Sequence, residues 1–233
     1  MLAAFVQAQG ATFPRGTCDQ VLYKTHYTIC YSARHRQAAW TSHLLSYESV
    51  NGKAKRSNRF QVDYQTENPV FPEEYKDSGF DRGHLVPAAD MKLSRQAMRE
   101  SFLMSNMSPQ HPQMNRGLWS SLENTIRFWV RNYGDTWVVT APVLNSKLRS
   151  LHNGIAVPQY FYKIVYVPSQ ELMAAFLVPN IDTSNQSFWK YATTVDKIEE
   201  LTGFDFFTEL PKALEDRLER KKTSSKHWPL SDF

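Results

Sequence analysis

The clearest alternation of apolar and polar positions lies in the segment 115–133, where apolar residues recur at helical spacing. Gly134 follows this segment as a helix terminator. The positions that fall on one side of such a helix are Leu118, Leu122, Ile126, Trp129 and Val130. The sequence therefore predicts one long helix with a buried face, which ends at about Tyr133.

Stretches typical of strands stand before and after this helix. Segments rich in Val, Ile, Tyr and Thr, or in continuous apolar runs, predict strands over 21–31, 39–48, 136–141, 157–167 and 172–178. Shorter helices are expected over 94–102, 193–201 and 211–222. This arrangement predicts an α+β fold with a central mixed or antiparallel β-sheet flanked by helices.

The remaining segments have the composition of loops. Residues 63–80 contain prolines, glycines and acids, and residues 104–114 are polar and interrupted by two prolines, so both are expected to be irregular. The basic run 51–60 fits either a solvated loop or an arm that contacts phosphates. The lysine-rich segment 221–226 is expected to be mobile. No repeat or linker divides the chain, so residues 18–233 are predicted to form a single domain.

Composition narrows the protein class only slightly. The chain of 233 residues is 42% hydrophobic and 21% charged, which is typical of a folded soluble protein. No apolar run approaches the roughly 20 residues of a membrane span. The formal net charge of +4 favours a polyanionic partner without establishing one.

The N-terminal region bears on the cellular compartment. Residues 1–17 have small residues at Ala-x-Ala-like spacing but no basic segment, so they fit either the remnant of an export signal or a simple N-terminal helix or tail. Cys18 and Cys30 are the only cysteines. They flank a strand-like stretch and fit either a disulfide, which would suit an oxidising compartment, or two buried free thiols.

The candidate chemistry begins at the run Asp81-Arg82-Gly83-His84. Histidine can take a proton near neutral pH, and an arginine can hold a phosphate with two hydrogen bonds. Gly83 would allow a tight turn that lets its neighbours converge on one point. A charged surface loop with an incidental histidine is the alternative.

A second group lies on the flank of the predicted long helix. Asn115, Glu123 and Arg127 are spaced by eight and then four residues, which brings them to one side of a helix. Taken alone, they are explained better by an Asn at the helix N-terminus and an ordinary surface pair between Glu123 and Arg127 than by a functional site.

Three motifs follow one another in a fixed order: Asp81 to His84, Ser105-Asn106-Met107-Ser108-Pro109-Gln110, and Asn115-Arg116-Gly117-Leu118-Trp119 with Leu122-Glu123. Together they resemble the DNA/RNA non-specific endonucleases of the ββα-metal (His-Me finger), endonuclease G-like type. The resemblance extends from about Val21 to the segment 198–207. It implies an α+β domain that contains a ββα-metal active-site motif.

The resemblance implies a base and a metal site. His84 matches the general base that activates water against phosphorus. Asn115 matches the direct protein ligand of a single Mg²⁺, with Mn²⁺ as a substitute, and Glu123 matches the acid that supports the metal and its water. A hard cation that keeps most of its water suits so small a ligand set.

The same resemblance assigns the substrate contacts. Arg82 and Arg127 are similar to arginines that contact the phosphate, and Asn106 resembles a residue that orients the site around the base. Upstream, Arg56 fits the spacing of a further phosphate contact, and Arg59 lies close enough to compete with it.

These residues supply what phosphodiester hydrolysis requires: a base for the nucleophile, positive charge at the phosphoryl oxygens, and an acidified water for the leaving oxygen. The resemblance implies cleavage of DNA and RNA, bound through their phosphates, to 5′-phosphate ends. A catalytically silent nucleic-acid-binding protein and a small-molecule phosphodiesterase are the alternatives. Secretion or the periplasm is the expected compartment. A homodimer and an unidentified protein inhibitor are partners that the sequence leaves open.

Overall fold

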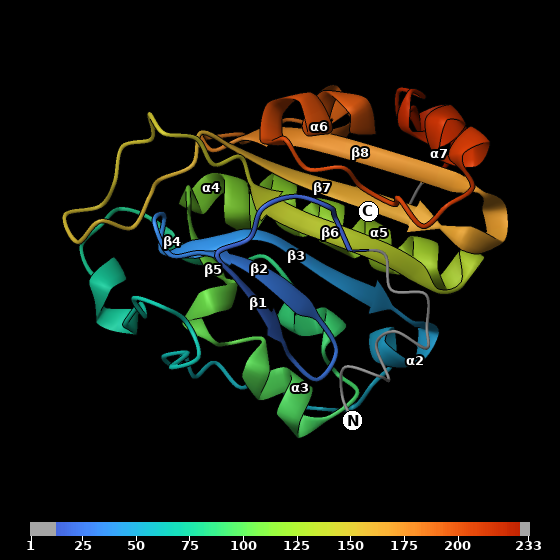
Figure 1. The fold of residues 1–233 in the computed structure, drawn as a ribbon. Coiled ribbons are helices and arrows are strands. Elements are labelled where there is room, and N and C mark those ends of the chain that lie inside the picture. Colours follow the sequence, from blue (N-terminus) through green and yellow to red (C-terminus); the bar gives the residue numbers. More distant parts are fainter. Residues whose placement is uncertain (1–12, 229–233) are drawn as a thin grey trace.

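The centre of the fold is an antiparallel β-sheet (Figure 1). The computed structural model describes residues 13–228, so most of the segment 1–17 lies outside the described residues. Within residues 13–228 the sheet has seven strands, in the spatial order β1 (Gln20–Tyr23), β2 (Thr28–Ser32), β3 (Gln37–Leu45), β6 (Thr136–Pro142), β7 (Tyr160–Val167), β8 (Leu172–Pro179) and β9 (Ala192–Thr193). Every neighbouring pair is antiparallel. The predicted α+β class is confirmed.

Helices cover both faces of this sheet. The α-helices are α2 (Tyr47–Val50), α3 (Arg95–Glu100), α4 (Pro112–Met114), α5 (Ser120–Tyr133), α6 (Val195–Thr202) and α7 (Lys212–Glu219). Because side chains alternate along a strand, β7 contributes to two cores. Phe161 and Val165 pack with α5, whereas Ile164 and Tyr166 pack with α6 and α7. Figure 1 shows α6 and α7 side by side over β8.

The long helix was predicted correctly. A π-helical turn over Asn115–Trp119 leads directly into α5, and Gly134 with φ 90° ends it. All five residues of the predicted apolar stripe are buried. The predicted strand 21–31 is instead a hairpin of β1 and β2, because a turn at residues 24–27 reverses the chain.

The expectation of a loop over 104–114 is wrong. Residues Met107–Gln110 form β5, which pairs with β4 (Asp81–His84) in a separate two-stranded ribbon. Pro109 is tolerated because its carbonyl points away from β4 and accepts a hydrogen bond from Asn180 Nδ2 at 3.0 Å. The missing N–H of the proline would point the same way, so the ribbon loses no pairing.

The segment 221–226, expected to be mobile, is held against the sheet. The Thr223 N–H donates to the Thr193 carbonyl at 3.1 Å, and the Ala175 N–H donates to the Thr223 hydroxyl at 2.7 Å. Just beyond, Trp228 is buried with its ring centroid 4.2 Å from that of Trp129. The lysines obscured these anchoring contacts in the sequence. No helix among the described residues has the length and apolarity needed to cross a membrane.

Cys18 and Cys30 are joined by a disulfide, which decides between the two alternatives left by the sequence. The bond ties the segment before β1 to the middle of β2. Cys30 is fully buried on the sheet face that also carries α6 and α7. The cross-link therefore fastens the edge of the sheet to one of its two cores.

We expect the double variant Cys18→Ala with Cys30→Ala to lose about 3 kcal/mol of unfolding free energy, because a loop with a sequence separation of 12 residues is no longer closed in the unfolded chain. Urea unfolding with and without a reducing agent measures this. The reducing agent should destabilise the parent and leave the double variant unchanged. Equal stability of parent and variant would show that the bond contributes nothing.

Candidate active site

Strand β4, the residues that follow it, the basic segment and the start of the long helix line a cavity of about 420 Å³. Of the eight residues singled out from the sequence, six line it: Arg56, Arg82, His84, Asn115, Glu123 and Arg127. They come from the basic segment, from β4 and from the helix that begins at the π-helical turn. Residues far apart in the sequence therefore converge on one cavity. Arg59 and Asn106 do not line it.

His84 is the last residue of β4 and packs between aromatic rings. Its ring centroid lies 4.8 Å from that of Phe102 and 5.8 Å from that of Phe60. Its Nε2 is buried and has no hydrogen-bond partner among the described residues. Burial, followed by the positive charge of Arg56, lowers the pKa of His84 to about 3. The imidazole is therefore neutral at physiological pH.

Gly83 serves a different purpose from the expected turn. It lies in the extended strand β4, directly opposite Ser108 of β5. A Cβ at this position would overlap the buried side chain of Gln110. The glycine is required because Gln110 approaches closely, and this close approach sets the position of His84 beside the cavity.

Asn106 is fully buried behind His84. Its Oδ1 accepts the Val86 N–H at 2.9 Å, and its Nδ2 donates to the carbonyls of Val86 and Ser101, both at 2.9 Å. Its own carbonyl accepts the Leu85 N–H at 3.0 Å. Asn106 thus fixes the backbone that follows His84 without facing the cavity.

Asn115 is oriented by Asp81, a residue that the sequence interpretation did not assign to the site. The Asn115 Nδ2 donates to Asp81 Oδ2 at 2.8 Å, and Arg116 holds the same carboxylate through two hydrogen bonds of 2.9 and 2.6 Å. Oδ1 is therefore the Asn115 atom left available for a ligand. The position of Asp81 at the start of the Asp-Arg-Gly-His run was the available signal.

Glu123 is partly buried in the wall of the cavity and lies near a buried lysine, Lys163, which does not itself line the cavity. Burial raises the pKa of Glu123, although the positive charges of Lys163 and Arg127 oppose the shift. Lys163 projects from β7 beneath α5, where its Nζ donates to Thr140 Oγ1 at 2.6 Å and lies 4.8 Å from the Trp119 ring centroid. Burial lowers the pKa of Lys163.

Arg127 is tied to a second buried acid. Its Nη1 donates to Asp90 Oδ1 at 2.7 Å, and its Nη2 donates to Asn124 Oδ1 at 2.7 Å. Asp90 also lies 3.2 Å from His43 Nε2. The surface pair between Glu123 and Arg127 that the sequence allowed is thus replaced by a buried pair with Asp90. Sequence spacing gives no indication of the contacts of Asp90, because Arg127 and His43 come from α5 and β3, two elements far from Asp90 in the chain.

The other arginines lie at the rim of the cavity. The Arg82 guanidinium lies 4.4 Å from the Phe60 ring centroid, and the Arg56 guanidinium lies 5.0 Å from that of Phe102. Arg56 is held further by a 2.7 Å hydrogen bond to Asn58. Stacking on aromatic rings leaves much of the donor edge of each exposed guanidinium open to a phosphate.

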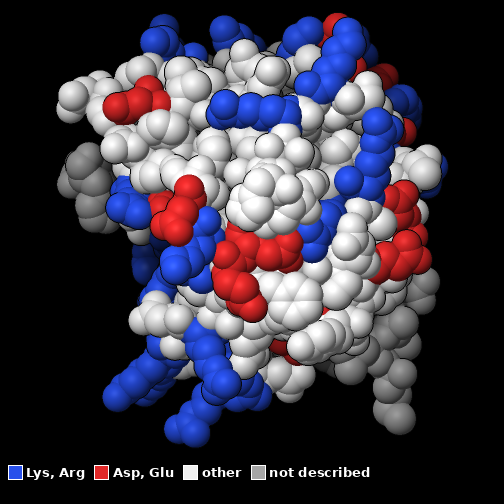
Figure 2. All heavy atoms as spheres, turned by 90° about the vertical axis from the view of Figure 1, so that its left-hand side faces the viewer, with Lys and Arg blue, Asp and Glu red and all other residues white. Residues whose placement is uncertain are grey.

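The donor set fits a hard divalent cation. The Asn115 Oδ1 and the Glu123 carboxylate offer oxygen only, which is the ligand type that Mg²⁺ prefers, and the cavity leaves space for water and phosphate oxygens. Figure 2 shows basic and acidic side chains interspersed over the face that it views, with basic ones beside the acidic group near its middle. Positive charge therefore does not form a uniform field.

Comparison with known proteins gives one consistent result. The family described as DNA/RNA non-specific endonuclease matches residues 7–213. Nuclease C1 of Cunninghamella echinulata var. echinulata is 34% identical over 218 residues, which cover 82% of this chain and 84% of that protein. A nuclease of Nostoc sp. is 32% identical over 228 residues, covering 91% and 82%. Mitochondrial endonuclease G of Bos taurus is 28% identical over 208 residues, covering 80% and 69%.

A solved structure, described as the EndoG/EndoGI complex and the mechanism of EndoG inhibition, has the same fold. It aligns with a TM-score of 0.80 at 28% sequence identity, covering 86% of this chain and 89% of that one.

We expect Gly83→Ala to lower the unfolding free energy by about 1–3 kcal/mol and to reduce nucleic-acid cleavage, because the new methyl group must displace β4 or Gln110. Adding Gln110→Ala should restore much of both by removing the overlapping atoms. Gly117→Ala is the matched control, since a Cβ there meets nothing within 4 Å. Equal behaviour of the two glycine variants would refute the proposed close approach.

Proposed function

The chain belongs to the DNA/RNA non-specific endonuclease family and is therefore a nucleic-acid-cleaving hydrolase, and we propose that it is a Mg²⁺-dependent endonuclease without sequence or sugar specificity. Its substrates are DNA and RNA, and its products carry 5′-phosphate ends. One observation carries the proposal: a neutral imidazole, an amide oxygen, a carboxylate and arginines from separate elements line the same cavity.

His84 is proposed as the general base. An imidazole that is uncharged at neutral pH can accept a proton from water, and an approaching phosphate would oppose the positive charge of Arg56 and make the ring more basic. As the water oxygen bonds to phosphorus, His84 takes one of its protons. The bond between phosphorus and O3′ breaks, and O3′ takes a proton from solvent water.

Asn115 and Glu123 are proposed to hold the cation, through the Asn115 Oδ1 and the Glu123 carboxylate. When bound, Mg²⁺ or a substituting Mn²⁺ neutralises the charge that develops on the phosphoryl oxygens and acidifies water. Asp81 orients the Asn115 amide, because the 2.8 Å hydrogen bond occupies Nδ2. The positive charges of Arg127 and Lys163 favour the carboxylate form of Glu123 that a cation requires.

Arg56 and Arg82 are proposed to contact the phosphate from the rim of the cavity, with Arg127 behind them. Contacts to phosphate carry no base information, so this set accounts for cleavage that ignores sequence. The placement favours Arg56 over Arg59 as the upstream contact, since Arg59 is exposed outside the cavity. Asn106 is proposed to act through the backbone that it holds behind His84.

Secretion or a periplasmic location is proposed on two grounds. The Cys18–Cys30 disulfide suits an oxidising compartment. A nuclease without sequence specificity also endangers the genome of its own cell. A homodimer is proposed from the family resemblance. A protein inhibitor is proposed only by analogy with the EndoG/EndoGI complex.

We expect His84→Ala to lower kcat by about 10²–10⁴-fold while binding of nucleic acid changes little, because the imidazole moves a proton and the arginines hold the phosphate. Nicking of supercoiled plasmid and digestion of structured RNA measure turnover, and filter binding in EDTA measures affinity. The exposed His152→Ala is the control. Near-normal cleavage by His84→Ala would remove this residue from the proposed role.

A metal titration tests the second part of the site. We expect Asn115→Ala to raise the Mg²⁺ concentration needed for half-maximal cleavage by tenfold or more, since Oδ1 is the proposed ligand. Asn132→Ala serves as control, because this exposed asparagine of α5 only donates to the Phe128 carbonyl. An unchanged titration in Asn115→Ala would place the metal ligand elsewhere.

A further inference from the structure

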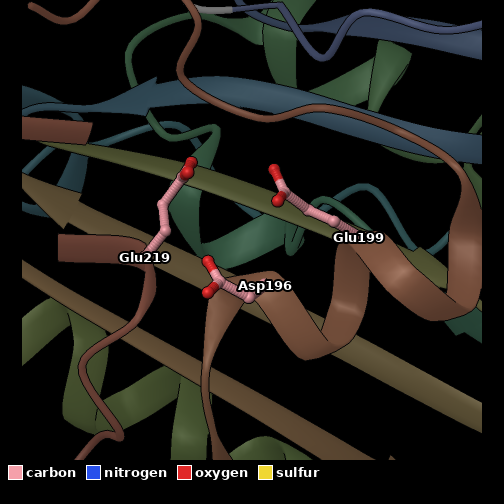
Figure 3. A group of neighbouring side chains, drawn as sticks. All are labelled: Asp196, Glu199 and Glu219. Carbon is pink, nitrogen blue, oxygen red and sulfur yellow. The ribbon is translucent and has the colours of Figure 1, made fainter. Parts of the chain in front are cut away.

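A group of three carboxylates lies on the sheet face opposite α5, between the start of α6 and the end of α7. Figure 3 shows the side chains of Asp196, Glu199 and Glu219 projecting into one space from these two helices. One oxygen of each lies within 4.8 Å of an oxygen of the other two. The group is separated from the candidate active site by the whole thickness of the sheet.

The group contains a buried oxygen that nothing in the fold satisfies. The Glu219 side chain is 4% exposed, and its Oε1 is buried without a hydrogen-bond partner among the described residues. Among residues 13–228, no ion pair involves any of the three carboxylates. A buried carboxylate oxygen without a partner costs several kcal/mol, so the fold provides for a ligand here.

The nearby cationic side chains are engaged elsewhere. On α6, Lys197 pairs with Glu200 at 2.7 Å. On α7, Lys212 pairs with Glu215 at 3.3 Å and with Asp216 at 3.0 Å. These lysines therefore do not neutralise the three carboxylates where they converge.

Asp196 stands in the first turn of α6, where the helix dipole favours an acid, but two other features of the group are unfavourable without a cation. Asp196 and Glu199 stand one turn apart on α6, where like charges repel. Glu219 is the last residue of α7, at the helix end whose dipole disfavours negative charge. Each of these penalties is relieved by the same ligand, a positive ion between the two helices.

We propose that Asp196, Glu199 and Glu219 form a Ca²⁺ site that joins α6 to α7. Calcium binds oxygen ligands at about 2.3–2.6 Å, so ligand oxygens on opposite sides of one ion lie up to about 5 Å apart, as the 4.8 Å limit of this group allows. The set contains no nitrogen or sulfur, which argues against zinc. Asp196 is exposed, so water can complete the coordination.

A proton is the competing occupant. Burial, followed by the neighbouring carboxylates of Glu199 and Glu215, raises the pKa of Glu219 to about 9. The experiment must therefore detect the bound ion itself. Three carboxylates with partial exposure fit a weak site, with an expected Kd of about 10⁻⁴–10⁻³ M.

Isothermal titration calorimetry of the full chain with CaCl₂ tests the proposal. The titration uses the Asn115→Ala variant as background, because this substitution weakens metal binding at the candidate active site. We expect one binding event in this background. Adding Glu219→Gln should weaken it by tenfold or more, and adding Asp196→Asn should weaken it severalfold. Glu200→Gln, an exposed acid of α6 paired with Lys197, is the matched control and should bind as the background does.

Thermal unfolding gives a second readout. Millimolar CaCl₂ should raise the Tm of the background and of the Glu200→Gln control but not that of the Glu219→Gln variant, while plasmid cleavage by Glu219→Gln in the native Asn115 context stays normal. Absence of calcium binding in the background, or equal binding with Glu219→Gln, would overturn the proposal. In that case a proton shared among the carboxylates would be the occupant.

Discussion

The candidate site depends on the buried ion pair between Asp90 and Arg127. The Asp90 carboxylate accepts a hydrogen bond from Arg127 on α5 and lies beside His43 on β3, so one side chain connects the segment after His84 to both the sheet and the long helix. Burial by itself would raise the pKa of Asp90, but Arg127 and His43 outweigh burial and lower it. The acid is therefore charged at neutral pH. Removing either side of such a pair leaves an uncompensated buried charge, which costs about 3–5 kcal/mol. Arg127 and His43 compensate the charge of Asp90 and so hold the segment after His84 in place beside the cavity.

The same face of the sheet carries the other charges that shape the cavity. Along β7, Phe161 and Val165 belong to the apolar core under α5, and Lys163 occupies the position between them. Its ammonium group lies against Trp119 and Thr140 and contributes positive potential to Glu123. A lysine in an apolar row is costly unless its charge is used nearby. Here the charge of Lys163 favours the ionised form of Glu123, which faces the cavity. A residue of the core thus affects the charge of a residue of the site.

Much of this architecture follows from local sequence. The 3.6-residue period of residues 118–130 was sufficient to predict the long helix, and this helix carries Glu123 and Arg127 at the cavity, whereas Asn115 reaches the same cavity from the π-helical turn that precedes α5. What could not be predicted depends on contacts between distant segments. Pro109 concealed β5, because a proline fits a strand only when its unpaired edge is satisfied, and Asn180 supplies that contact from far along the chain. Gly83 suggested a turn, whereas the reason for the glycine is the side chain of Gln110. Asp81 and Asp90 appeared as ordinary charges, because only the folded chain shows that each orients a residue of the site.

Asp90 and Glu219, two buried acids on opposite faces of the sheet, differ in their partners. On the α5 face, Asp90 has Arg127 as a close cationic partner, and Glu123 has the positive charges of Lys163 and Arg127 nearby. On that face the chain itself therefore supplies cationic side chains close to these two acids. On the α6–α7 face, the carboxylate of Glu219 is buried without such a partner, and the core beside it is anchored by a disulfide. Both features make that face sensitive to the surrounding solution, through its redox state and through whatever proton or cation it supplies. A fold divided in this way can keep its catalytic geometry constant while its overall stability depends on the medium in which it works.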